Sequence, residues 1–365
     1  MPELNPDSLL RWYQAHKRDL PWRYTNDPYK IWISEVMLQQ TRVDTVISYY
    51  HRFIEALPTI QSLAEADLQQ VLKLWEGLGY YSRARNLHDA ARTVVSRYNG
   101  TLPDTYDEIT QLKGVGPYTA AAVLSIAFQK KHAVVDGNVI RVVTRFLGIE
   151  EDIRKASTQR LVREFVEEMI PAERPGDYNQ AVMELGATIC KPVGPLCSAC
   201  PIAHNCVAGN SVMTHVIPYK SPAKKIPHHQ IVTGLIVNNE SKILISQRPE
   251  EKMLGGLWEF PGGKQESGET LKEALQRELA EELNIKATIF DRFKVLNHAY
   301  SHFRITLHAF WCRIDEGIPE PRSSTALRWV TPEEMTRFPF PTANKRILDE
   351  LTQLNSGQLL KQFRK

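Results

Sequence analysis

Four of the chain's five cysteines lie close together, at positions Cys190, Cys197, Cys200 and Cys206, in the stretch CKPVGPLCSACPIAHNC. Four thiolates on one compact loop could bind zinc or an iron–sulfur cluster, and their spacing alone does not separate the two. The fifth, Cys312, belongs to a distant segment that alternates like a strand, and we interpret it as a core thiol. In an intracellular chain such a group indicates metal binding in preference to disulfides.

A second group of side chains suited to chemistry lies in GGKQESGETLKEALQRELAEELNI, residues 262–285. If this segment is helical, Glu278, Glu281 and Glu282 share one face, because they are three and four residues apart. Like charges at that spacing destabilise a helix slightly, whereas clustered carboxylates suit a hard divalent cation such as Mg²⁺. A Mg²⁺ site is therefore one interpretation. The other, which we favour, is a scaffold helix whose acidic face is solvated.

Further candidate residues lie just before or within predicted helices in the first half of the chain. In LKGVGPYTA, Gly114 and Gly116 allow backbone amides to converge before an alanine-rich helix, an arrangement that favours phosphate, although a tight turn explains it equally well. In VVDGNVI, Asp136 opens another helix and by itself would be interpreted as an N-cap. In WISEVML, Glu35 by itself would be a solvent-facing helical glutamate.

The elements that must position these residues change character along the chain. From residue 7 to about 190, apolar residues recur at steps of three and four, which predicts helices separated by Pro and Gly. Residues 209–230 are rich in Pro, Lys and His, which is typical of a linker. Beyond them, IVTGLIV, KILISQR and FRITLHAFWCRI predict strands. With one central helix, this last part is predicted to be mixed α and β.

Length and composition limit the number of domains and the classes of protein to which the chain could belong. The 365 residues have room for about two domains. A hydrophobic fraction of 42% and a charged fraction of 24% are ordinary for a globular protein, and the net charge of +3 only weakly indicates a polyanionic partner. There is no run of eighteen apolar residues and no apolar signal-peptide core, so we expect neither a membrane span nor secretion.

Taken together, the motifs resemble a known family. LKGVGPYTA, then VDGNV, then the four cysteines follow the order of the endonuclease III superfamily of DNA glycosylases, and LPWR, WISEVMLQQTRV and WEGLGYYSRARNL resemble its adenine DNA glycosylase (MutY) branch. Residues 262–285 resemble the Nudix box, with Gly263, Glu269 and Arg277 in place and Asn284 where that family has glycine. A glycine at the C-terminal end of a helix usually adopts the left-handed backbone conformation, and asparagine tolerates that conformation.

The resemblance implies a multidomain fold: an all-α helix-hairpin-helix glycosylase domain with an iron–sulfur cluster loop, followed by an α+β Nudix-like domain. We place the first domain at 1–212 with its cluster loop at 190–206, a linker at 213–229, and the Nudix-like 8-oxoguanine recognition domain at 230–365. The implied cofactor is a 4Fe-4S cluster on the four cysteines. The implied partner is double-stranded DNA containing A:8-oxoguanine or A:G mispairs, bound by a monomer that does not associate with membranes and acts in the cytoplasm, at the nucleoid.

The implied reaction is excision of adenine by hydrolysis of its N-glycosidic bond. By resemblance Glu35 is the acid that protonates the leaving adenine, and Asp136 stabilises the positive charge that develops on the sugar. Asn138 and Tyr118 match supporting positions. Members that also cleave the backbone carry lysine where this chain has Tyr118, and a phenol cannot form a Schiff base, so no strong lyase step is expected.

The resemblance also assigns residues that bind the substrate. Arg23 and Gln180 match positions that hydrogen-bond the extruded adenine, with Trp22 packing the pocket. Ser301 and His302, in NHAYSHFRI, match the loop that recognises 8-oxoguanine, although Tyr300 stands where the family more often has phenylalanine. The positions that match residues reaching the partner base or the gap in the stack are Gln40, Thr41, Leu78 and Tyr80.

Two competing functions are compatible with parts of the sequence. The C-terminal half could be an active nucleotide pyrophosphohydrolase attached to the glycosylase. The chain could also be a non-catalytic lesion-binding protein, which the joint presence of Glu35 and Asp136 disfavours.

Overall fold

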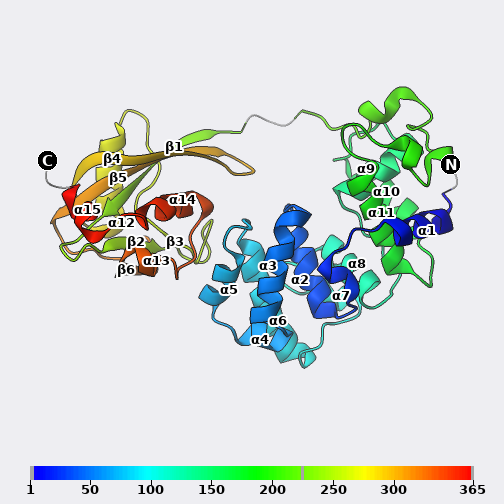
Figure 1. The fold of residues 1–365 in the computed structure, drawn as a ribbon, viewed down its shortest axis with the longest axis horizontal. Helices are drawn as coiled ribbons and strands as arrows, with labels where there is room; N and C mark the ends of the chain where they lie inside the picture. Colours follow the sequence, from blue (N-terminus) through cyan, green and yellow to red (C-terminus); the bar gives the residue numbers. More distant parts are fainter. Residues whose placement is uncertain (1–3, 223–225, 363–365) are drawn as a thin grey trace. The chain divides into compact units, whose positions relative to one another are not determined.

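The computed structural model describes residues 4–222 and 226–362, and the chain divides into two compact units (Figure 1). Unit 1 comprises residues 1–65 and 86–223, and unit 2 comprises residues 66–85 and 224–365. The predicted fold class is confirmed, since a helical part is followed by an α+β part. Within the predicted linker 213–229, residues 223–225 lie outside the described residues.

The first two thirds of the chain form helices, as the apolar periodicity predicted. They are α1 (Pro6–His16), α2 (Pro28–Leu38), α3 (Val43–Ala56), α4 (Ile60–Glu65), α5 (Leu68–Trp75), α6 (Ser82–Tyr98), α7 (Tyr106–Ile109), α8 (Pro117–Ile126), α9 (Gly137–Leu147), α10 (Ala156–Met169) and α11 (Pro175–Thr188), with short 3₁₀ turns at η1 (Pro21–Tyr24), η2 (Cys197–Ala199), η3 (Ala203–Asn205) and η4 (Val212–His215). In the part of the chain that the structure describes, no helix has the length and apolar character needed to cross a membrane.

Helix α9 shows how local sequence sets the ends of these helices. Asp136 is its N-cap, and the Asp136 carboxylate accepts a hydrogen bond from the Val139 backbone N–H. The helix ends at Gly148, which adopts the left-handed conformation at φ 72°, where a residue without a Cβ is favoured. The apolar face between these ends carries Val139, Val142 and Phe146, which are all buried.

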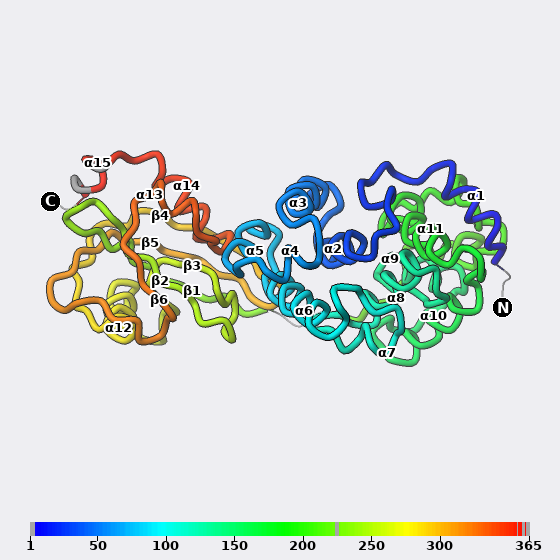
Figure 2. The backbone as a smooth tube through the Cα atoms, turned by 90° about the horizontal axis from the view of Figure 1, so that it is seen from below, coloured from blue at the N-terminus to red at the C-terminus, as the bar shows by residue number. Residues whose placement is uncertain are grey.

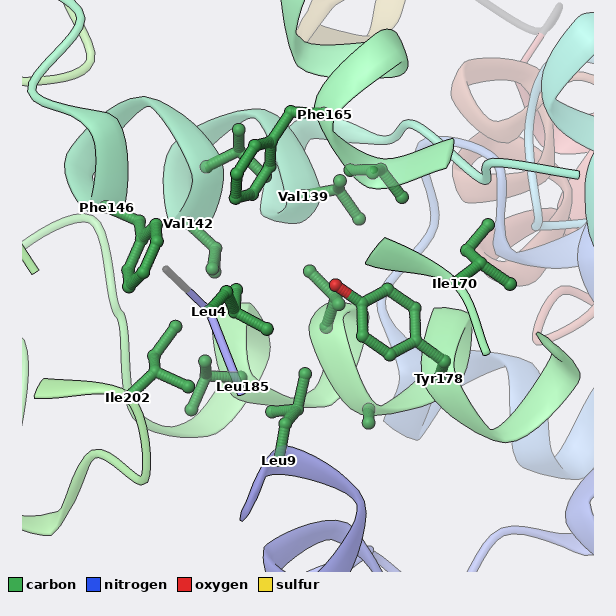
Figure 3. Packing of buried hydrophobic residues seen from close by; sticks show 14 of the residues in the cluster. Leu4, Leu9, Val139, Val142, Phe146, Phe165, Ile170, Tyr178, Leu185 and Ile202 are labelled. Atoms are coloured by element: carbon green, nitrogen blue, oxygen red, sulfur yellow. The ribbon is translucent and has the colours of Figure 1, made fainter. Parts of the chain in front are cut away.

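The core of unit 1 joins α9 to its neighbours. In Figure 3, Val139, Val142 and Phe146 of α9 face Tyr178 and Leu185 of α11. Leu9 of α1, Phe165 of α10 and Ile202 from the cysteine-containing loop belong to the same cluster. The cysteine loop therefore packs on the same core that supports α9.

Unit 2 is built from two three-stranded sheets and the helix α12 (Leu271–Leu283). In the first sheet, β5 (Arg304–Glu316) lies between β1 (His228–Ile236), which is parallel to it, and β4 (Lys286–Ala299), which is antiparallel with register shifts. In the second, β2 (Ile243–Gln247) pairs antiparallel with β3 (Trp258–Glu259) and β6 (Ala326–Val330). The helices α13 (Pro332–Met335), α14 (Thr342–Leu351) and α15 (Ser356–Lys361) complete the unit, whose trace can be followed in Figure 2.

Helix α12 is the helix predicted within residues 262–285. It begins with a capping box in which the side chains of Thr270 and Glu273 bond each other's backbone N–H groups. It ends at Asn284 in the left-handed conformation, at φ 58°, which is the backbone shape expected of asparagine there. Its buried face packs on the first sheet beside Cys312, whose complete burial agrees with a core thiol.

Residues 66–85 group with unit 2, which the sequence did not lead us to expect. From α5, the Gln69 amide donates to the Gly256 carbonyl (2.9 Å) and accepts from the Trp258 indole N–H (3.0 Å). After α5, the carboxylate of Glu76 accepts the Phe340 backbone N–H at 2.9 Å. These bonds join residues 66–85 to backbone and indole groups of the C-terminal segment, so residues 66–85 are structurally part of unit 2.

Candidate active site

All four predicted catalytic residues line one cavity in unit 1. Its walls come from η1, α2, α8, α9, α11 and the turn after α2. The predicted site residues that line this cavity are Trp22, Arg23, Glu35, Thr41, Tyr118, Asp136, Asn138 and Gln180. The structure thus brings together side chains that are more than 150 positions apart in the sequence, as Trp22 and Gln180 illustrate.

The Glu35 carboxyl is buried at this cavity. Glu35 is 4% exposed, because its neighbours along α2 from Ile31 to Met37 are buried as well. Burial raises the pKa of Glu35 to about 7, while the hydrogen bond that the Tyr118 hydroxyl donates to Oε2 (2.7 Å) acts in the opposite direction. Glu35 can therefore hold or release a proton near neutral pH.

Asp136 is a carboxyl in a more polar setting. Its Oδ1 accepts the Val139 backbone N–H at 2.7 Å and its Oδ2 accepts the Asn138 amide at 2.8 Å. Burial raises the pKa of Asp136, and these hydrogen bonds oppose the rise. Glu35 and Asp136 thus lie on one cavity in different environments, a pattern that divides acid and anion roles between them.

A buried glutamate on α11 was missed by the sequence analysis. The side chain of Glu184 is fully buried, and its carboxylate accepts from Arg23 at 2.7 Å and from both Nε and Nη2 of Arg18 at 2.8 Å. Burial alone would raise the pKa of Glu184, but the two arginines lower it to about 2. One signal was available, because Glu184 follows Gln180 by four residues and so shares its helix face.

Helix α9 also connects the cavity to the cysteine loop. One turn after Asn138, Arg141 donates through Nη2 to the Asn138 side-chain oxygen (2.8 Å) and through Nε to the Cys190 carbonyl (2.7 Å). One further turn along, Arg145 donates to the Cys190 sulfur (3.4 Å) and to the Lys191 carbonyl (2.7 Å). The buried face of α9 therefore fixes the start of the cysteine loop.

The four predicted metal ligands surround one small cavity beside α9. Cys190, Cys197, Cys200 and Cys206 all line it, together with Arg145. Within residues 4–222 and 226–362, no three His, Cys, Asp or Glu side chains converge closely enough to hold a single metal ion. A zinc site would need its sulfurs about 2.3 Å from one point. The four thiols line one shared space, so all four are placed to bind a single group.

Three predicted residues of unit 1 lie outside the catalytic cavity. Gln40 is exposed, next to Thr41, with a positive φ of 57°. Gly114 and Gly116 form the exposed turn before α8. Gly114 has φ +80°, and a Cβ there would lie 2.6 Å from the Cβ of Asn86, so the turn requires glycine.

The remaining predicted recognition residues meet in unit 2. Tyr80 is 40% exposed, and its hydroxyl is hydrogen-bonded to that of Ser301 although 221 residues separate them. The guanidinium of Arg83 lies 5.5 Å from the Tyr80 ring centroid. Leu78 is buried, and His302 is exposed beside Ser301. Residues 66–85 and the loop after β4 thus form one surface.

The glutamates of the Nudix-type box are engaged by neighbouring protein groups. Arg277 forms ion pairs with Glu269 (2.8 Å), Glu278 (3.1 Å) and Glu281 (3.3 Å). Glu282 accepts the Gly262 backbone N–H at 3.1 Å and the Ser323 hydroxyl at 3.0 Å. These contacts attach the loop before α12 to the helix.

Gly263 in that loop packs directly on the box. A Cβ at Gly263 would lie 2.4 Å from the Glu278 carboxylate, so a side chain there would have to displace that carboxylate. Burial raises the pKa of Glu278.

Both halves of the chain are similar to known protein families. A model of the "HhH-GPD superfamily base excision DNA repair protein" family matches residues 33–168, and a model of the NUDIX domain matches residues 232–350. The chain is 36% identical to an adenine DNA glycosylase of Rattus norvegicus, across 93% of this chain and 76% of that protein. It is also 30% identical to one of Buchnera aphidicola, across 96% and 97%.

Among solved structures, the chain is similar to a thermostable thymine-DNA glycosylase. The two are 31% identical with a TM-score of 0.51, and the match covers 56% of this chain and 94% of that one.

Proposed function

This chain belongs to the adenine DNA glycosylases, enzymes of base excision repair, and we propose that it excises adenine paired with 8-oxoguanine or guanine, without a strong lyase step. The observation that carries the proposal is the pair of carboxyls, Glu35 and Asp136, on one cavity with different environments. The proposed substrate is double-stranded DNA, bound by a monomer in the cytoplasm.

Glu35 supplies the proton in this proposal. Adenine in a duplex must leave the base stack before its glycosidic bond can be reached, and adenine leaves poorly as an anion. A carboxyl with a pKa of about 7 is protonated in a useful fraction of molecules at neutral pH and still acidic enough to donate. The hydrogen bond from Tyr118 stabilises the carboxylate that remains after donation.

Asp136 stabilises the sugar. As the bond breaks, positive charge develops on the sugar, and an ionised carboxylate in a partly desolvated cavity offsets it. The hydrogen bonds from Val139 and Asn138 hold Asp136 in one orientation and favour its anionic form. Tyr118 occupies the position that carries lysine in enzymes with lyase activity, and its phenol cannot form the Schiff base that such cleavage needs.

Adenine recognition is assigned to other side chains of the same cavity. Arg23, Gln180 and Trp22 line the cavity, and Trp22, which is 7% exposed, packs edge-on against Tyr50. The ionised Glu184 holds Arg23 in place through a 2.7 Å ion pair. A carboxylate fixed by two arginines needs no proton, so it positions Arg23 without competing with Glu35 for the acid role.

Recognition of the mispaired partner base is assigned mainly to unit 2. Ser301, His302 and Tyr80 present hydroxyl, imidazole and aromatic groups on one exposed surface, as reading and stacking of a base require. Leu78 lies under this surface. In unit 1, Gln40 and Thr41 are proposed to reach the partner base, and the turn of Gly114 and Gly116 to bind phosphate.

The four cysteines are proposed to hold a 4Fe-4S cluster, which this family generally carries. All four line one cavity and do not converge on a single ion, which fits a cluster better than zinc. The bound cluster supplies a cross-link among four thiolates. The chain's own contribution is the pair Arg141 and Arg145, which fix the Cys190 backbone and the surrounding carbonyls.

The Nudix-type box is proposed to act as a scaffold. Arg277 and the Gly262 backbone already engage Glu278, Glu281 and Glu282. These contacts leave the loop before α12 fixed and give the glutamates a structural role without Mg²⁺.

The first prediction concerns the rate of adenine excision as a function of pH. Because Glu35 donates only when protonated, the single-turnover rate of the wild-type protein should fall as pH rises through about 7. Tyr118→Phe removes a bond that favours the carboxylate, so the pKa of Glu35 should rise and the fall should move to higher pH. Glu35→Gln should bind the duplex but excise adenine at least about a hundredfold more slowly. A wild-type rate in Glu35→Gln would refute the acid assignment.

The second prediction concerns the cofactor. Protein purified from iron-replete cells should be brown and contain iron and sulfide in equal amounts. Cys197→Ser should lose both colour and sulfide, because it removes one of four proposed ligands. Cys312→Ser is the matched control and should keep them, since Cys312 is buried in the core of unit 2. Zinc without sulfide in the wild-type protein would contradict the proposal.

The third prediction concerns discrimination of the partner base. Changing Ser301 and His302 together to alanine should lower the ratio of adenine excision opposite 8-oxoguanine to excision opposite guanine. Losing one good base contact costs about 1–3 kcal/mol, which is a factor of about five to a hundred. Thr288→Ala, at the other end of β4, should leave the ratio unchanged. An unchanged ratio in the double variant would show that another loop recognises the lesion.

The fourth prediction concerns the Nudix-type box. Calorimetric titration of the full chain with Mg²⁺ should give no binding heat at this site, and incubation with 8-oxo-dGTP should release no pyrophosphate. The full chain is the right sample, because unit 2 includes residues 66–85. Pyrophosphate release that disappears in Glu281→Gln would mean that the chain is a two-activity enzyme.

A further inference from the structure

Tyr13 of α1 lies behind the catalytic cavity and contacts two of the side chains proposed to bind adenine. It is 1% exposed, and it does not itself line the cavity. Its hydroxyl donates a hydrogen bond to Oε1 of Gln180 at 3.2 Å. The guanidinium carbon of Arg23 lies 5.4 Å from the centroid of its ring. Tyr13 therefore contacts both residues from within the protein interior.

The contacts of Gln180 select one orientation of its amide. Nε2 lies 3.4 Å from the Gly176 carbonyl oxygen, which can only accept, and Oε1 faces the Tyr13 hydroxyl. A flipped amide would bring its oxygen against the Gly176 oxygen, and the Tyr13 hydroxyl would lose its acceptor. The Gly176 carbonyl and the Tyr13 hydroxyl therefore favour the same orientation of the Gln180 amide.

This orientation matters for adenine, which offers a donor beside an acceptor. The 6-amino group donates and the adjacent ring nitrogen accepts, so a glutamine amide can bond both only if its oxygen and nitrogen are in the right order. An amide that is free to rotate would spend part of its time in the wrong order. Fixing the amide before the base arrives removes that loss.

The ring of Tyr13 acts on Arg23 in addition to the polar contacts of that residue. Arg23 donates to the Arg18 carbonyl at 2.9 Å and to Glu184 at 2.7 Å. The tyrosine ring lies within cation–π distance of the same guanidinium. Burial raises the pKa of Tyr13 to about 12, so its hydroxyl stays protonated and remains a donor throughout the physiological pH range.

We propose that Tyr13 is a positioning residue for adenine recognition, which acts by fixing the amide of Gln180 through its hydroxyl and the guanidinium of Arg23 through its ring. This inference rests on the proposed role of Gln180 and Arg23 in binding adenine. Tyr13 itself touches neither the substrate nor the reacting atoms.

Tyr29 provides a matched control in the same unit. It is 5% exposed on α2, and its hydroxyl donates to the Leu57 carbonyl at 2.7 Å. Tyr29 does not line the cavity. Tyr29→Phe and Tyr13→Phe each delete one buried hydroxyl and one hydrogen bond, so a general loss of stability should affect both similarly.

The test measures single-turnover excision by the full-length protein with Tyr13→Phe, Tyr29→Phe, Gln180→Ala, and Tyr13→Phe combined with Gln180→Ala. We expect Tyr13→Phe to be about three- to tenfold slower than wild type on adenine, the size of effect of one hydrogen bond. It should be less impaired on a duplex with purine, which lacks the 6-amino group, in place of adenine. Tyr29→Phe should excise both bases at the wild-type rate.

The double variant separates positioning from a structural role. In the Gln180→Ala background, Tyr13→Phe should cause no further loss, because its hydroxyl then has no amide to orient. Tyr13→Leu, which also removes the ring, should be slower than Tyr13→Phe with wild-type Gln180, since Arg23 loses its aromatic neighbour.

Two results would overturn the inference, and a third would overturn its premise. Equal rates for Tyr13→Phe and Tyr29→Phe, or a loss that is fully additive with Gln180→Ala, would show that Tyr13 does not act through Gln180. A wild-type rate in Gln180→Ala would instead refute the proposed role of Gln180. Thermal unfolding of each variant identifies a loss that comes from unfolding, because Tyr29→Phe sets the size expected for a deleted buried hydroxyl.

Discussion

The burial of the Glu35 carboxyl on an otherwise apolar helix is the constraint on which the rest of unit 1 depends. Water would hold this group ionised at neutral pH, and removing water raises its pKa to about 7. Desolvation of that degree needs walls on all sides, which α2 alone cannot supply. The side chains of η1, α8, α9 and α11 close the cavity, and the Tyr118 hydroxyl is the polar partner that makes the buried carboxyl tolerable.

Helix α9 presents Asp136, the second carboxyl of the proposed chemistry, and connects the cavity to the cysteine loop. Its N-cap, Asp136, uses the same hydrogen bonds to start the helix and to keep its own carboxylate oriented. Its buried arginines then bind the backbone around Cys190, and its apolar face shares a core with Ile202 of that loop (Figure 3). A displacement of the loop would therefore act on the helix that presents Asp136.

The surface of unit 2 that we propose to recognise the partner base is assembled from two pieces of chain that are distant in the sequence. The loop after β4 supplies Ser301, and residues 66–85 supply Tyr80. Gln69 and Glu76 hold residues 66–85 in unit 2 by bonding the backbone of Gly256 and Phe340 and the indole of Trp258. The glutamates of the Nudix-type box also hold part of unit 2 in place. Their bonds to Gly262 and Arg277 fix the loop before α12.

The sequence by itself determined the features that depend on residues near one another in the chain. Local stereochemistry explains the N-cap at Asp136, the helix within 262–285 and the left-handed Asn284. The spacing of the cysteines and the order of the motifs, which are properties of the sequence itself, identified the cysteine loop, Glu35 and Gln180. Only the tertiary structure decided that Glu184 would pair with Arg18 and Arg23, that Tyr13 would orient Gln180, and that residues 66–85 would join unit 2. Each of these contacts joins residues more than a hundred and fifty positions apart, and such contacts produce no periodic pattern in the sequence. They exist because a buried polar group must find a partner, and only the folded packing determines which one is within reach.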